Sequence, residues 1–166
     1  LPAKRSAPAG QARVWSQLFS TRGLVVVEPQ ILRPAVPEFF VSALERAAEI
    51  RNRLQAVTQR LIEAGYKAAI TSEDAGALYT FDADGQRVRV RDPRAHLQDA
   101  ALNPVRYSTD AALRPLLADT LLPVVASVLG PGEVAYQGML RPLYDLYGLP
   151  QPVLFPRKSY TVVTES

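Results

Sequence analysis

Apolar side chains recur at helical spacing along the longest periodic segment of the chain, residues 37–64. Four of them share one helical face, in steps of four, three and four residues: Ile50, Leu54, Val57 and Leu61. Pro37 suits the first turn of this helix, and Gly65 suits the residue at which it stops. The pattern is typical of a helix that packs on a sheet, and a coiled-coil seam is the alternative.

The chain before this segment predicts a lead-in, a short helix and a strand. Residues 1–10 are rich in Pro, Ala and Gly, which favours a flexible lead-in. Residues 12–23 predict a short helix that ends at Gly23. "LVVVEP", residues 24–29, has apolar side chains at successive positions, which is typical of a strand buried on both faces, as in parallel sheets.

Three further strands are predicted after the long helix, at residues 66–71, 77–82 and 87–92. The last two are joined through "DADGQ", in which Asp84-Gly85 is a strong hairpin signal. Because the surrounding pattern alternates helix and strand, we interpret this hairpin, about residues 77–92, as an insertion.

Three arginines share one face of the last of these strands: Arg87, Arg89 and Arg91. Val88 and Val90 point to the opposite face. A row of guanidinium groups on a sheet can hold phosphate groups, but a solvated outer face is the more common outcome. The sequence does not decide between these two roles.

The second half of the chain alternates between helices and strands. Helices are predicted at residues 111–122 and 132–148, and strands at residues 123–130 and 151–157. A strand, a helix and a strand in succession imply a right-handed crossover between parallel strands. We therefore predict one α/β domain over residues 11–166, with a mostly parallel sheet and flanking helices.

Composition excludes several kinds of site. The 166 residues include no cysteine, which excludes disulfides, thiolate metal ligands and a cysteine nucleophile. His96 is the only histidine, so a two-histidine metal site is impossible and we expect no metal. It lies in a short helix predicted to start at Pro93, and we interpret it as a surface or half-buried structural residue.

Charge and hydropathy exclude further classes of partner. The net charge of +3 is too small to argue for a polyanion, and no aromatic side chains alternate with the arginines, so nucleic-acid binding is not supported. No apolar run approaches the ~20 residues that span a bilayer. The first residues lack the apolar core of a secretory signal, and we expect no membrane partner.

The turn "GPGE", Gly130 to Glu133, stands between a predicted strand and a helix. Ligands of open α/β sheets bind at this carboxyl edge, where the N–H groups and the dipole of the helix favour anions. The pattern lacks the third glycine of a dinucleotide fingerprint and the lysine of a Walker loop. It also suits a simple helix start, since Pro131 presets the first turn and Glu133 complements the dipole.

Residues 113–157 carry motifs that resemble one enzyme family. Their order is Leu-Arg-Pro, Asp-Thr-Leu-Leu-Pro, Gly-Pro-Gly-Glu, Ala-Tyr, Leu-Arg-Pro and Pro-Arg, beginning at positions 113, 119, 130, 135, 140 and 156. With "FSTRGLVVVEP", residues 19–29, they resemble the bacillithiol-biosynthesis cysteine-adding enzymes, also called cysteine ligases. Asp110 stands where that family usually has Asn.

The resemblance implies a Rossmann-like core from the middle portion of such an enzyme, located in the cytoplasm. The family joins cysteine to glucosaminyl-malate through an amide bond, and its full-length members dimerise through a coiled coil. A nucleotide such as ATP could activate the carboxylate, although the sequence identifies no cofactor. We expect the fragment alone to be inactive.

Amide formation suggests roles for seven residues. We predict Glu133 and Arg114 as catalytic, with Glu133 holding or deprotonating the amine. We predict five residues as substrate-binding: Asp110, Gly130, Gly132, Tyr136 and Arg157. Two other classes stay open at this stage, a non-catalytic nucleotide- or anion-binding module that uses the same turn, and an oligomerisation module that uses residues 37–64.

Overall fold

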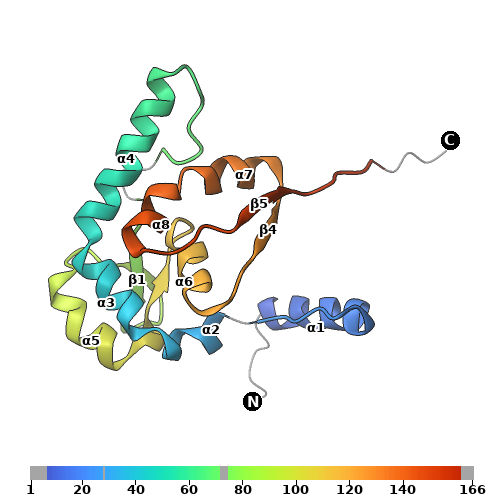
Figure 1. The fold of residues 1–166 in the computed structure, drawn as a ribbon. Helices are drawn as coiled ribbons and strands as arrows, with labels where there is room; N and C mark the ends of the chain where they lie inside the picture. The colour runs from blue at the N-terminus through green and yellow to red at the C-terminus, as the bar shows by residue number, and fades with distance from the viewer. Residues whose placement is uncertain (1–6, 28, 72–74, 162–166) are drawn as a thin grey trace, which may run out of the picture. The chain divides into compact units, whose positions relative to one another are not determined.

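The computed structural model describes residues 7–27, 29–71 and 75–161 (Figure 1). The chain divides into two compact units, residues 1–32 and 33–166. Within the described residues, no helix is both long enough and apolar enough to cross a membrane.

The first unit consists of helices. Helix α1 (Ala7–Phe19) continues as a 3-10 turn (Ser20–Arg22) and ends at Gly23, whose φ of 74° is left-handed. The predicted helix end is therefore confirmed, and the last four residues of the predicted lead-in, 7–10, belong to α1. The short helix α2 (Pro29–Leu32) follows.

The strand predicted at residues 24–29 is wrong for its described part. Residues 24–27 form no strand, and Val25 is 79% exposed. Glu28 lies outside the described residues, and Pro29 begins α2. An apolar β-branched run specifies extended backbone, but a strand also needs a neighbour to complete its hydrogen-bond ladder.

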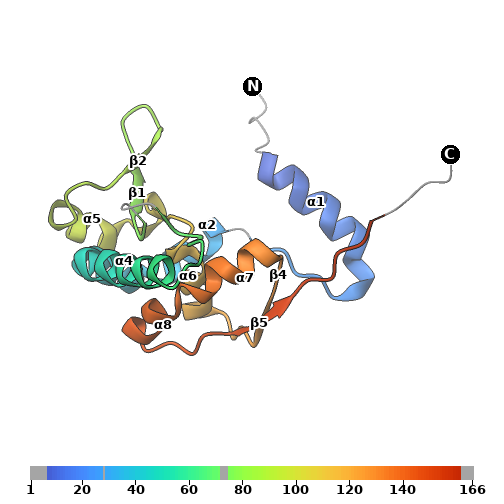
Figure 2. The ribbon, with the colours of Figure 1, turned by 90° about the horizontal axis from the view of Figure 1, so that it is seen from above.

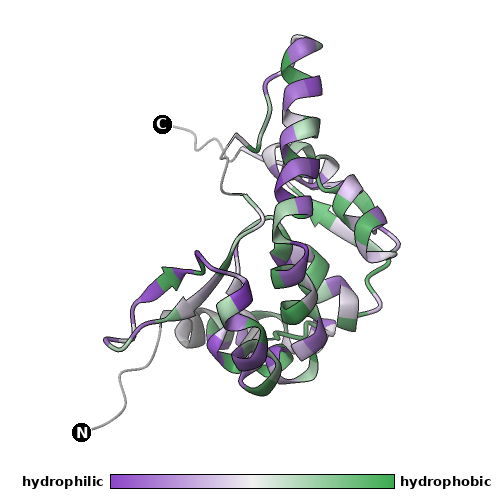
Figure 3. Ribbon diagram, turned by 90° about the vertical axis from the view of Figure 1, so that its left-hand side faces the viewer, coloured by the Kyte–Doolittle hydropathy of each residue, from purple (hydrophilic) through white to green (hydrophobic). Residues whose placement is uncertain are grey.

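The long periodic segment forms two helices in the second unit. After a 3-10 turn (Arg33–Ala35), α3 (Pro37–Glu45) and α4 (Ala47–Glu63) are separated at Arg46. The predicted stripe is buried at Ile50 and Leu54 and half-buried at Val57 and Leu61. It packs on helix α8 (Arg141–Tyr147) rather than lying on a sheet. Figure 3 shows polar and apolar residues in turn along α4.

A three-stranded antiparallel sheet contains β1 (Leu78–Phe81), β2 (Arg87–Arg89) and β3 (Ser108–Thr109), in the order β2-β1-β3. The predicted β1–β2 hairpin forms. In its turn, Asp82 Oδ1 accepts the N–H groups of Asp84 at 3.1 Å and Gln86 at 2.8 Å. Gly85 supplies the positive φ that the turn needs, 73°.

The strand predicted at residues 66–71 is wrong. Ala68 and Ile70 are buried in alternation, as in a strand, but the backbone of Ile70 joins no sheet. Its N–H donates to Met139 Sδ at 3.4 Å, and its carbonyl accepts from the Thr58 hydroxyl at 2.7 Å. Side-chain partners thus satisfy backbone groups that a strand would have paired.

The segment from residue 92 to residue 122 is helical around β3. It contains a 3-10 turn (Arg94–His96), α5 (Leu97–Leu102), a second 3-10 turn (Pro104–Arg106) and α6 (Leu113–Leu121). His96 is half-buried, and its Nδ1 lies 2.9 Å from the hydroxyl of the fully buried Tyr107. That position agrees with the structural role predicted for His96.

The last part of the chain is a strand–helix–strand unit. Strand β4 (Ala126–Leu129) pairs in parallel with β5 (Val153–Pro156), and α7 (Pro131–Gly138) contacts both. Figures 1 and 2 show α7 beside the pair. The single helix predicted at 132–148 is divided into α7 and α8. Pro142 explains the break, because its ring would clash with the carbonyl of Gly138 in a continuous helix.

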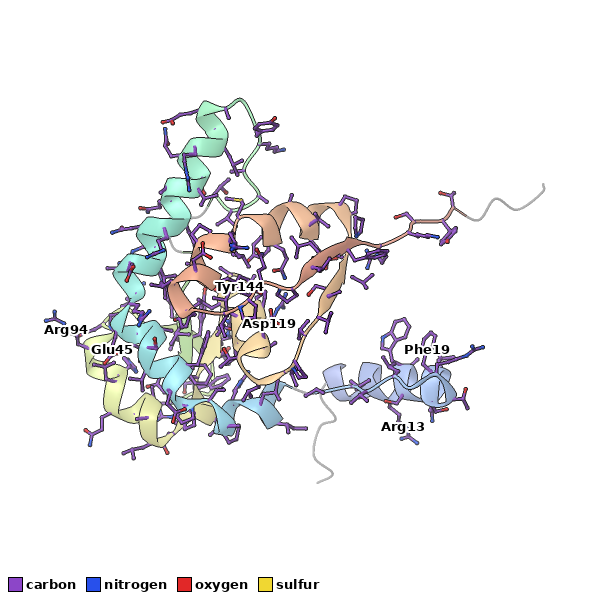
Figure 4. The ribbon with its side chains drawn as sticks, in the orientation of Figure 1. Arg13, Phe19, Glu45, Arg94, Asp119 and Tyr144 are labelled. Atoms are coloured by element: carbon purple, nitrogen blue, oxygen red, sulfur yellow. The ribbon has the colours of Figure 1, made fainter. Side chains whose placement is uncertain are left out.

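The core of the second unit lies among α3, α4, α6, α8 and β1. Its largest fully buried side chains are Phe40, Ile50, Leu54, Tyr107, Leu113, Leu116, Leu140, Leu143 and Tyr144. The Tyr144 hydroxyl donates to Asp119 Oδ2, which joins α8 to α6 (Figure 4). The described residues thus hold one parallel strand pair and one antiparallel sheet.

Candidate functional site

The carboxyl ends of β4 and β5 lie side by side because the two strands are parallel. Gly130 follows β4, and Arg157 follows β5. The Arg157 N–H donates to the Leu129 carbonyl at 2.6 Å and closes this end of the ladder. The predicted glycine turn and the predicted arginine therefore meet at one edge of the sheet.

Gly130 leaves room for two charged side chains at this edge. A Cβ atom added to Gly130 would lie 3.0 Å from Nη2 of Arg157 and 3.3 Å from Oε2 of Glu133. Any larger residue would therefore displace one of the two groups. At Gly132 a Cβ would meet nothing within 4 Å, so a side chain at that position would face open space.

Glu133 serves as the cap of helix α7. Its Oε2 accepts the Gly130 N–H at 2.7 Å, and its side chain belongs to an exposed residue. This satisfies one of the amide donors at the helix start and places negative charge at the positive end of the dipole. The Gly130 N–H that was predicted as a ligand donor is therefore already engaged by Glu133.

Asp110 organises the start of helix α6. Its Oδ1 accepts the Leu113 N–H at 3.0 Å, and its Oδ2 accepts the N–H groups of Gly76 at 2.7 Å and Ala77 at 3.2 Å. Both carboxylate oxygens of this predicted substrate-binding residue thus bond to the protein backbone. These hydrogen bonds give Asp110 a structural role, since they hold the start of α6 and the backbone of Gly76 and Ala77.

Tyr136 and Arg114 complete a second group of predicted residues around Asp110. Burial raises the pKa of the half-buried Tyr136 hydroxyl, the Asp110 carboxylate raises it further, and the Arg114 guanidinium acts in the opposite direction. These interactions place α7 and α6 side chains within electrostatic reach of each other. The Arg114 side chain is exposed, so it is available to an anion.

Helix α7 carries one residue of each group: Glu133, which lies with Gly130 and Arg157, and Tyr136, whose pKa responds to Asp110 and Arg114. Glu133 lies in its first turn and Tyr136 three residues later, which is one helical turn. Arg157 and Arg114 are exposed cations at the two ends of this arrangement, and each can pair bidentately with a carboxylate or phosphate. Among the described residues, no group of three or more acidic or histidine side chains could hold a metal ion.

The row of three arginines predicted on β2 does not act as one group. Arg87 donates to Ser108 Oγ at 3.1 Å and lies over the Tyr79 ring at 3.7 Å. Arg89 and Arg91 instead line a cavity together with Arg51 of α4. Sequence reasoning missed Arg51, because a lone arginine in an amphipathic helix carries no local signal.

Comparison with known proteins identifies the family. Residues 6–158 match the family model described as "Bacillithiol biosynthesis BshC, N-terminal Rossmann-like domain". The chain belongs to the BshC family. The resemblance drawn from the Gly-Pro-Gly-Glu and flanking motifs is therefore confirmed, and with it the Rossmann-like fold class.

Curated relatives carry the name "Putative cysteine ligase BshC". That of Desulforamulus reducens is 29% identical over 88% of this chain and 30% of the relative. Those of Geobacillus kaustophilus and Symbiobacterium thermophilum are 30% and 33% identical over 93% and 91% of this chain. Because these matches cover only 32% and 31% of the two relatives, the chain spans about a third of their length.

Proposed function

We propose that this chain supplies part of the site of a cytoplasmic ligase that joins cysteine to glucosaminyl-malate through an amide bond in bacillithiol biosynthesis. Family membership and the relatives' name support a cysteine ligase. The observation that carries the proposal to this site is the meeting of Gly130, Glu133 and Arg157 at the carboxyl edge of the β4–β5 pair. Ligands of open α/β sheets bind at that edge.

Each charged residue has a role that its position allows. Arg157 and Arg114, both exposed, bind substrate carboxylates and neutralise their charge. Glu133 receives the substrate amine, since its second oxygen remains available while Oε2 holds the Gly130 N–H. The Gly132 N–H, in the unpaired first turn of α7, and the Tyr136 hydroxyl donate to the developing oxyanion.

We also propose that the β4–β5 pair is part of a larger sheet in the complete protein. Val128, Val153 and Phe155 expose apolar side chains on β4 and β5. Because parallel strands are normally buried on both faces, we expect the remainder of the complete protein to cover this pair and extend it into a mostly parallel sheet. The β1–β2 hairpin would then be an insertion, and the complete protein a homodimer.

The same reasoning predicts that the chain alone does not turn over. An amide site at a sheet edge needs both substrates and an activated carboxylate, and the chain spans only about a third of its relatives. A nucleotide such as ATP is the activator to test first.

A chimera tests the proposal. This chain would replace the matching region of the Geobacillus kaustophilus relative, and mass spectrometry would follow the amide product from cysteine, glucosaminyl-malate and ATP. We expect product from the folded chimera and none from the 166-residue chain. Product from the chain alone would contradict the split site. A folded, dimeric chimera that binds neither substrate in calorimetry would contradict the ligase assignment.

A further inference from the structure

A cavity of about 400 Å³ lies between helices α3 and α4 and the β1–β2 hairpin. Three guanidinium groups line it: Arg51 from α4, Arg89 from the end of β2, and Arg91 just beyond that strand. None of the seven residues proposed for the ligase site lines this cavity in the part of the chain that the structure describes. It is therefore a second place at which this chain could bind a small molecule.

The described lining is cationic and otherwise apolar. Besides the three arginines it contains only alanine, glycine, leucine, valine and proline, with no carboxylate. Within the described residues, neither Arg51 nor Arg91 makes an ion pair. Arg51 and Arg91 bring two positive charges to one cavity, and a bound anion would offset the repulsion between them.

The wall of the cavity is fixed by backbone hydrogen bonds. Val90 N–H donates to the Leu78 carbonyl at 2.9 Å, which holds the strand between the two hairpin arginines. At Gly76, which also lines the cavity, the N–H donates to Asp110 Oδ2 at 2.7 Å. Gly76 has φ +84°, and a Cβ there would lie 2.3 Å from Cγ2 of Ile50, so only glycine lets this loop approach α4. The arginines thus project from a preorganised frame.

We infer that this cavity binds a small metabolite through an oxyanion group, a phosphate or a pair of carboxylates. A guanidinium fork pairs bidentately with either group, and the forks of Arg51 and Arg91 together suit a group with at least two negative charges. The volume falls within the usual range of small-molecule sites, about 300–1,000 Å³. Leu44, Leu78 and Val90 would contact the carbon skeleton of the ligand.

Calorimetric titration of the 166-residue chain in phosphate-free buffer tests the inference, with pyrophosphate, inorganic phosphate and malate as probes. We expect saturable binding of one pyrophosphate per chain, and the comparison with malate distinguishes a phosphate site from a carboxylate site. R51Q and R91Q should each weaken the preferred anion about tenfold, because each removes a charged hydrogen-bond partner.

R60Q is the matched control. Arg60 lies on the same helix as Arg51, is exposed, and does not line the cavity in the described structure, yet its substitution removes the same charge. We expect R60Q to bind within about twofold of the wild type, since an exposed remote charge is screened. R51K, which keeps the charge but not the fork, should fall between wild type and R51Q. Melting temperatures of all variants verify that they are folded.

Three outcomes would overturn the inference. Equal weakening by R60Q and R51Q would show non-specific attraction instead of a site. Glu73 and Asp74 precede the cavity residue Ala75 in the sequence and lie outside the described residues. The E73Q/D74N variant removes both of these acidic charges. If this variant bound anions and the wild type did not, the cavity would not be a metabolite site in the native chain. The same would follow if neither the wild type nor any variant bound an anion. Neither readout depends on amide formation, so failure of the proposed ligase function would leave this test intact.

Discussion

The two sheets of the second unit differ in how completely they are covered. Strand β1 lies in the core, with Leu78 only 4% exposed, whereas β4 and β5 leave Val128 63% and Phe155 55% exposed. The antiparallel sheet finds its packing partners within the chain, in α3 against β1 and α6 against β3. Among the described residues, the parallel pair has α7 as its helix and exposes apolar side chains that a second layer normally covers in such sheets. This exposure supports the proposal that further parts of the complete protein cover the β4–β5 pair, at whose carboxyl edge the proposed ligase site lies.

The two regions should differ most in how a glycine substitution changes the free energy of unfolding. G76A should destabilise the chain by about 2–5 kcal/mol, because it combines a strained positive φ with overpacking against Ile50. G132A should be neutral or stabilise α7 by up to about 1 kcal/mol, since its Cβ would face open space. Urea unfolding of both variants measures the contrast. Equal destabilisation would mean that the turn is as tightly packed as the core.

Truncation of one strand residue in each sheet should again destabilise the chain more in the antiparallel sheet than in the parallel pair. L78A should cost about 2–5 kcal/mol, as expected for a fully buried leucine. V128A should change the stability of the isolated chain by no more than about 0.5 kcal/mol, because the side chain is exposed. In the chimera, V128A should cost more than in the chain. An unchanged cost would argue against a covering partner.

The tyrosine that joins α8 to α6 should have an intermediate effect. Tyr144 is buried and donates to Asp119 Oδ2, so Y144F should cost about 1–3 kcal/mol by leaving that carboxylate without its donor. Thermal unfolding at pH 7 measures the loss. Y66F is the control, since Tyr66 is exposed. If both variants melted at the wild-type temperature, the hydrogen bond would contribute nothing to stability.

Asp119 should also give a pH dependence. Burial raises the pKa of this carboxyl above its ordinary value, and the hydrogen bond from Tyr144 opposes that shift. The folded state therefore holds the proton more tightly than the unfolded chain, and the stabilisation from protonation is lost as the pH rises from the unfolded to the folded pKa. Relative to D119N, the wild type should lose stability across that window. A constant difference between pH 3 and pH 7 would contradict the burial of this group.

The cap on α7 should have the smallest effect. E133A removes the acceptor of the Gly130 N–H and should cost about 0.5–2 kcal/mol. E133Q keeps an acceptor oxygen and should cost less, while still removing the charge needed for the proposed amine binding. Circular dichroism melting of the two variants separates the structural role from the charge. Identical losses would assign the effect of Glu133 to its charge alone.

Local signals accounted for the turns and helix ends. Pro37, Gly65 and the Asp84-Gly85 turn mark boundaries that the structure shares, because each position imposes a backbone geometry that few residues adopt. The sequence also brought Gly130 and Arg157 to one edge, since parallel strands must end together. Such features depend on neighbours in the chain or on topology alone.

Pairing and long-range contacts could not be predicted in this way. Residues 24–27 and 66–71 have the composition of strands, but the contacts that decide whether a strand forms can lie far along the chain, as the Met139 sulfur does for the Ile70 N–H. The cavity between α4 and the β1–β2 hairpin also depends on residues that lie far apart in the sequence. Arg51 and Arg91 are forty residues apart in the sequence but line the same cavity, beside Gly76, whose missing Cβ lets the loop approach α4.

The kcat/KM of the chimera carrying R157Q measures most directly whether the β4–β5 edge is a ligase site. We expect a loss of about 100-fold or more with an unchanged melting temperature, because an exposed arginine that binds substrate carboxylate contributes to catalysis and little to folding. R60Q, which removes a charge from α4, should retain wild-type turnover. Wild-type turnover in R157Q, or a loss that R60Q shares, would contradict a ligase site at this edge.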